Sequence, residues 1–198
     1  MIAYKKRPAP IIGLAALLIV VIFAVFFLFH PDQQIDRIIE QKGYGITEQT
    51  AAEITLTFPK SALSDQMFSE DGESFDPHQV IAYQDETTTI YLTHVQYANE
   101  GNDQMYFSFD FAYDLPKDHG SCLLPHEVTG PNAVSTSGFS LRSKTLRDDT
   151  TAYENTVLVH SQGPDMQISF YVATEALTKA EGTLSMDIFL NQLTYQAN

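Results

Sequence analysis

An uninterrupted apolar run of nineteen residues, IIGLAALLIVVIFAVFFLF at positions 11–29, limits most strongly what this chain can form. A helix rises about 1.5 Å per residue, so the run nearly spans the roughly 30 Å hydrocarbon core of a bilayer. It is longer than the apolar region of a cleavable signal peptide, and no small-x-small cleavage site follows it. We therefore predict an uncleaved transmembrane signal anchor at residues 11–29.

Basic residues next to the run predict its orientation. Lys5, Lys6 and Arg7 precede it, and such flanks stay on the cytoplasmic side of a membrane. We expect residues 1–10 to be a cytoplasmic tail and the rest of the chain to be extracytoplasmic. The predicted localisation is the cell membrane, with a single pass.

A short amphipathic helix is predicted directly after the run. Pro31 suits the start of a helix, and Ile35, Ile38 and Ile39 recur at the spacing of one helical face before Gly43 ends it. We assign residues 30–50 to a juxtamembrane helix and linker, and residues 51–198 to the extracytoplasmic domain.

The exported domain has the two-residue period of β-strands. The clearest stripe alternates along one strand and is rich in aromatic residues: Met105, Phe107, Phe109, Phe111 and Tyr113. Turn signals separate seven or eight such segments, which predicts a mainly β, immunoglobulin-like antiparallel β-sandwich. The proline-containing stretch 115–137 is expected to be irregular. A change of phase late in the chain predicts a β-bulge near Asn191 and Gln192.

Charge and cysteine content narrow the functional classes. All 25 acidic residues but only 8 of the 11 basic ones follow the apolar run, so the part after it has a formal net charge of −17. Such a surface repels nucleic acid, whose binding needs clustered Lys and Arg, so we expect no nucleic-acid partner. Cys122 is the single cysteine, so the domain has no internal disulfide.

The sharpest candidate for a metal site is the group His119, Cys122 and His126. Thiolate and imidazole are ligands for zinc and copper, although the spacing matches no known zinc finger. The alternative is that the three are loop residues that are close only in sequence. No resident cofactor is predicted.

A second candidate is a carboxylate-rich loop around Gly72. Glu70, Asp71, Glu73 and Asp76 could supply oxygen ligands for calcium, but they lack the spacing of an EF-hand. A solvated acidic loop explains the same residues.

Catalytic motifs are missing from the sequence, and we expect a protein that is not an enzyme. Ser121 lies near His119 and Cys122, but the Gly-x-Ser-x-Gly elbow of serine hydrolases is absent. Tyr91, Tyr106 and Tyr171 fall outside the core phase, and an exposed tyrosine row would suit contact with protein or glycan.

The anchor followed by the predicted sandwich resembles membrane-anchored bacterial surface proteins whose exported part is an immunoglobulin-like domain of unknown function. The resemblance implies a binding or accessory role and transfers no functional residue. We predict a single-pass envelope protein that contacts another membrane or cell-envelope protein through a sheet face or the 115–137 stretch. The alternatives are a sensor or immunity-type protein that binds a secreted cationic peptide, and a metal-binding protein or metal-dependent enzyme.

Overall fold

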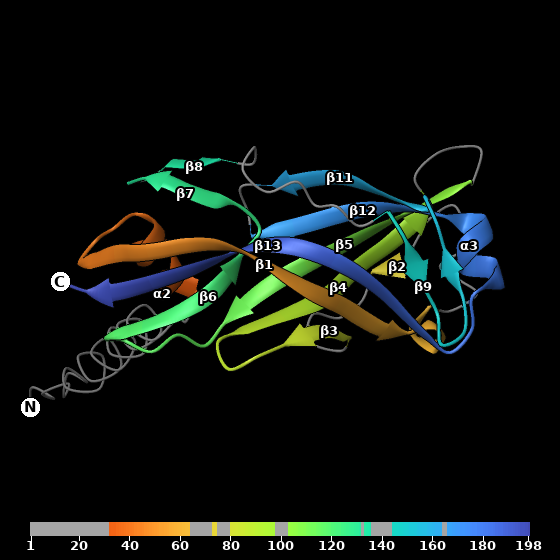
Figure 1. The fold of residues 1–198 in the computed structure, drawn as a ribbon, viewed down its shortest axis with the longest axis horizontal. Helices are drawn as coiled ribbons and strands as arrows, with labels where there is room; N and C mark the ends of the chain where they lie inside the picture. The colour runs from red at the N-terminus through yellow and green to blue at the C-terminus, as the bar shows by residue number, and fades with distance from the viewer. Residues whose placement is uncertain are drawn as a thin grey trace, which may run out of the picture.

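A computed structural model describes residues 32–63, 73–74, 80–97, 103–131, 133–135, 144–163 and 166–198 of the chain (Figure 1). The apolar run at 11–29 lies outside these residues, so the predicted anchor stays a prediction. Among the residues described, no helix has the length and apolarity needed to cross a membrane.

The described chain is mainly β, as predicted, and every strand pairing in it is antiparallel. Its helices are α2 (Asp32–Ile39), the 3-10 helix η1 (Lys60–Ala62) and α3 (Thr174–Lys179). Its strands are β1 (Tyr44–Pro59), β2 (Glu73–Ser74), β3 (Ile81–Gln84), β4 (Thr88–Tyr97), β5 (Gln104–Tyr113), β6 (His119–Leu124), β7 (Glu127–Gly130), β8 (Ala133–Ser135), β9 (Leu146–Arg147), β10 (Ala152–Tyr153), β11 (Val157–Gly163), β12 (Gln167–Ala173) and β13 (Thr183–Ala197).

Two larger sheets and one hairpin contain these strands. The first sheet has the order β1-β13-β9-β10, and β6 also pairs with β13. The second has the order β11-β12-β5-β4-β2, with β3 also on β4, while β7 and β8 pair separately. The first and last strands are thus neighbours in one sheet. In an immunoglobulin domain they belong to different sheets, so the strand order of this chain is not that of the immunoglobulin-like type of sandwich that we predicted, although no strand order was predicted.

Aromatic packing between the two sheets supports a sandwich. The ring centroid of Phe58 on β1 lies 5.8 Å from that of Phe107 and 6.0 Å from that of Phe109, both on β5. Phe109 also packs edge-on against Phe170 of β12, with centroids 5.9 Å apart. The predicted stripe on β5, from Met105 to Tyr113, is buried along its length. Alternation therefore predicted correctly which face of this strand enters the core.

Strand β13 buries opposite faces in its two halves. Leu184, Met186, Ile188 and Leu190 are fully buried, and the buried positions then change phase to Asn191, Leu193 and Tyr195. The predicted bulge near Asn191 is wrong, because pairing with β1 and with β6 is unbroken there, and the register shift in β1 lies between Ile46 and Glu48. The buried face changes instead because different parts of the structure cover the strand before and after Leu190.

Helix α2 lies at the end of the fold where β1 starts, opposite α3 (Figure 1). Its predicted stripe is buried: Ile38 is fully enclosed, and Ile35 and Ile39 are nearly so. The guanidinium of Arg37 lies 5.8 Å from the ring centroid of Tyr44. Because β1 already begins at Tyr44, residues 44–50 belong to a strand and not to the linker that we expected.

The stretch 115–137 is more regular than predicted, because β6, β7 and β8 all fall within it. β6 pairs with the end of β13, and its outer edge is tied to the second sheet: Leu123 donates its N–H to the hydroxyl of Thr88. Its prolines precede or follow these strands, where they cost no ladder hydrogen bond. Proline content alone therefore misled the prediction.

Candidate functional site

The three predicted metal ligands do not form a cluster. His119 and Cys122 are three residues apart on β6 and therefore point to opposite faces of the sheet, the first exposed and the second buried. His126 follows in the turn to β7 and is 1% exposed. Among the described residues, no group of three or more His, Cys, Asp or Glu side chains is placed to hold a metal ion. Burial raises the pKa of Cys122 to about 12, which disfavours the thiolate that metal binding requires.

Most of the predicted calcium loop lies outside the described residues, namely Glu70, Asp71 and Asp76. The backbone of Glu73 pairs with Val95 of β4. The calcium site therefore stays a prediction.

A small buried polar cluster surrounds the turn that holds His126. Asn191 is fully buried, and its amide nitrogen donates to Gln49 Oε1 at 2.8 Å and to the carbonyl of His126 at 3.1 Å. Gln49 also bonds both backbone groups of Val128, at 2.9 Å each. Among the described residues, neither ring nitrogen of His126 has a hydrogen-bond partner, which is rare for a buried side chain. This cluster fixes the β6–β7 turn on the long strands.

His126 makes the fold sensitive to acid. Burial lowers the pKa of His126 below its ordinary 6.5, so the unfolded chain binds a proton more readily than the folded one. This contribution to stability is intact above pH 6.5 and is lost as the pH falls towards the lowered pKa. We expect His126→Leu to reduce the loss of unfolding free energy between pH 7.5 and 5.5, measured by urea denaturation. An equal loss in both proteins would contradict this.

The outer face of the second sheet carries the predicted tyrosine row. The rings of Tyr106 and Tyr171 are neighbours with centroids 6.0 Å apart, and His94 lies 6.1 Å from Tyr106 on the other side. Tyr91 is on β4, farther along the same face, opposite Asp110. The side chains of Tyr91, Tyr106 and Tyr171 are all partly exposed. Together with Leu158, which is 52% exposed, they form a partly exposed patch on this face.

A concave surface of the described chain lies on the first sheet, beyond the part that the second sheet covers. The face of β13 that Leu184 and Leu190 bury under the second sheet continues into Gln192, Thr194 and Gln196, and there it is open. A cavity of about 720 Å³ occupies this face. Its lining comes from β1, β6 and β13: Thr47, Glu48, Thr50, His119, Gly120, Ser121, Gln192, Thr194, Tyr195 and Gln196.

The chemistry of this cavity is that of hydrogen bonding. Hydroxyl and amide groups predominate in the lining, with one carboxylate from Glu48 and one imidazole from His119, and none of its ten residues is Lys or Arg. Such a surface can donate to and accept from a polar ligand, and it offers no permanent positive charge to an anion. Tyr195 also belongs to the lining, and its hydroxyl donates to the carbonyl of Pro116 at 2.7 Å.

No family model, curated protein or solved structure matches the chain.

Two cavity residues had been considered from the sequence, His119 as a metal ligand and Ser121 as a nucleophile. The cavity residues of β1 and β13 had not been predicted. A signal for them existed: Gln192 and Thr194 continue the phase of Leu184 and Leu190, so one face of a single strand changes from apolar to polar. That change marks the point where the covering sheet ends.

Proposed function

We propose that this chain is a single-pass membrane-anchored, extracytoplasmic binding or accessory protein of the bacterial cell envelope that acts through protein–protein contact. One observation carries the proposal: the polar cavity is lined by the start of β1 and the end of β13, and these strand ends lie at the same end of the fold as α2 (Figure 1). Helix α2 begins at Asp32, directly after the apolar run that ends at Phe29. An anchor at 11–29 would hold this end of the domain next to the membrane.

The position and chemistry of the cavity together suggest the kind of partner. A surface held near the bilayer meets the membrane-proximal parts of other envelope proteins first. The hydroxyl and amide groups of Ser121, Thr194 and Gln192 can pair with backbone or polar side chains of such a protein. Part of the cavity comes from the 115–137 stretch, which the sequence already suggested as a contact region.

Site-specific photo-crosslinking in intact cells tests the contact. A photoreactive phenylalanine analogue replaces Thr194 inside the cavity, and in a control it replaces Glu181 near α3 at the opposite end. We expect a discrete adduct with one envelope protein from position 194 only. Ser121→Arg should abolish the adduct by filling the cavity while leaving the fold intact. No adduct at position 194, or one that survives Ser121→Arg, would contradict the proposal.

The anchor itself needs a separate test. Protease added to cells without an outer barrier should digest the domain, whereas residues 1–10 should stay protected on the inner side. Full protection of the domain would rule out the proposed orientation.

A second candidate function is a sensor or immunity-type protein that binds a secreted cationic peptide. The chain contains 25 acidic residues against 11 basic ones, and this excess favours positively charged ligands.

A further inference from the structure

Strand β1 is a long edge strand. It has sixteen residues, and in the described part of the chain it pairs with β13 alone. The outer edge of such a strand presents unpaired backbone N–H and C=O groups, to which another strand can add.

The register shows which residues present these groups. β1 and β13 pair without a break from Glu48 opposite Thr194 to Pro59 opposite Thr183. The N–H of Lys60 donates to the carbonyl of Gly182 at 2.8 Å, which extends that register by one hydrogen-bonded pair. Hydrogen-bonded pairs alternate along an antiparallel ladder, so the even-numbered residues of β1 bond to β13. The odd-numbered ones therefore direct their backbone groups outwards.

Ala51, Glu53, Thr55 and Thr57 are four consecutive outward positions with exposed side chains, and no described strand other than β13 pairs with this stretch. Pro59 has the same phase, and its lack of an N–H costs nothing at an edge. Strand β3 of the second sheet packs against β1, but its ladder hydrogen bonds are with β4, so it does not pair with the edge of β1. The open stretch, 51–57, is long enough for an added strand of about seven residues.

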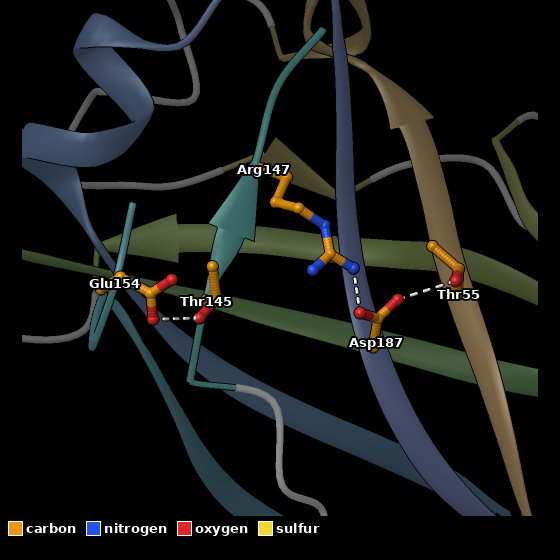
Figure 2. Close-up of polar contacts among 5 residues, drawn as sticks. All are labelled: Thr55, Thr145, Arg147, Glu154 and Asp187. Carbon is orange, nitrogen blue, oxygen red and sulfur yellow. Dashed lines mark hydrogen bonds and ion pairs between the residues drawn. The ribbon is translucent and has the colours of Figure 1, made fainter. Parts of the chain in front are cut away.

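The side chains along this edge are acidic or neutral. β1 contains Glu48 and Glu53 and has no Lys or Arg. Asp187 of β13 is nearby, but Arg147 of β9 forms an ion pair with it and the hydroxyl of Thr55 donates to it at 2.8 Å (Figure 2). Glu53 is not within 4 Å of a basic side chain of the described residues. It is therefore the charge that an added strand would meet.

We propose that the outer edge of β1, from Ala51 to Thr57, binds an extended polypeptide segment that carries Lys or Arg side chains. The segment adds to the first sheet as a further strand, and its cationic side chains lie beside Glu53. A second copy of the chain fits this edge less well, because each copy has a net charge of −14 and would bring its own Glu53. The site adjoins the polar cavity at Thr50 but shares no residue with it, so the proposal does not depend on the proposed cavity contact.

Direct binding measures the charge preference of the edge. The probe is a fluorescent seven-residue peptide of alternating valine and lysine, titrated with the full chain in neutral detergent and followed by anisotropy. We expect saturable binding that weakens as salt is added, and at least about tenfold weaker binding of the peptide with glutamate in place of lysine. Equal binding of the two peptides would overturn the proposed charge preference.

Two variants locate the site. Ala51→Pro removes an outward N–H without touching the ladder to β13, and Glu53→Lys reverses the charge beside the edge; each should weaken peptide binding about tenfold. Glu181→Lys makes the same change of charge near α3 and should leave binding unchanged. Wild-type affinity in both β1 variants would place the peptide elsewhere and refute the proposal.

Amide hydrogen exchange on the wild-type chain keeps the test independent of variant folding. Saturating peptide should slow exchange at Glu53, Thr55 and Thr57, whose N–H groups point outwards, while Ile54 and Leu56 are protected already. Unchanged exchange at the outward amides would contradict strand addition. Slow exchange that depends on protein concentration, without peptide, would show a second copy on the edge and would also contradict the proposed occupant.

Discussion

Phe109→Ala should lower the free energy of unfolding by about 3–5 kcal/mol, a large part of what a domain of this size has. Phe109 is fully buried on β5 and touches aromatic rings of both sheets, Phe58 on β1 and Phe170 on β12. Truncation removes the transfer free energy of a phenyl ring and leaves a cavity that two paired sheets cannot close. Denaturant unfolding of the full chain in detergent measures the loss.

The matched control is Leu158→Ala on β11, where the side chain is 52% exposed. This change should alter the unfolding free energy by no more than about 0.5 kcal/mol. If Phe109→Ala cost as little as Leu158→Ala, the two sheets would not pack face to face as described.

Gly182→Ala should have the second-largest effect, a loss of about 1–3 kcal/mol. Gly182 has a φ of +69°, which L-residues with a side chain rarely adopt, and it precedes β13 directly. The position that a Cβ would take is occupied by the carboxylate of Asp149. That carboxylate accepts the N–H of Thr183 at 3.2 Å, so moving it aside would also break a hydrogen bond.

Next to Asp149, the carboxylate of Asp148 accepts hydrogen bonds from the N–H groups of Thr150, Thr151 and Glu181. These bonds hold the pKa of the Asp148 carboxyl below its ordinary value. The turn before β13 is thus hydrogen-bonded to both Asp148 and Asp149 of the β9–β10 turn. These bonds restrain it from moving to make room for a new side chain.

Gly130→Ala is the control for this prediction. Gly130 has no positive φ, and the Cβ of Ala133, at 3.9 Å, is the only atom of the described residues that an added Cβ would meet. We expect its melting temperature to stay within about one degree of wild type, against a fall of several degrees for Gly182→Ala. Equal melting temperatures of the two variants would show that the turn at Gly182 tolerates a side chain.

Local patterns predicted much of the fold. The isoleucines of α2 and the aromatic stripe of β5 were assigned correctly, because amphipathic periodicity needs only one apolar side per element. The strand order was not predictable in this way. Pairing of the first strand with the last joins residues more than a hundred positions apart, and no local pattern encodes such a contact.

The candidate sites show the same division. The sequence grouped His119, Cys122 and His126 because they are close along the chain, whereas a β-strand sends residues three apart to opposite faces. The polar cavity combines β1, β6 and β13, which are distant in sequence. Its residues could be found only once these strands were placed side by side.

By itself, the sequence determined the apolar run, the acidic charge and the alternating strands, since each is a property of neighbouring residues. Only the tertiary structure decided that β13 buries one face at Leu190 and the other at Leu193, and that β1 is an edge. The physical reason is that burial depends on what covers a strand. The second sheet covers the β13 face that carries Leu184 and Leu190 but not its continuation at Gln192 and Thr194, so the same two-residue period produces a packed core in one part of the strand and an open polar cavity in the next.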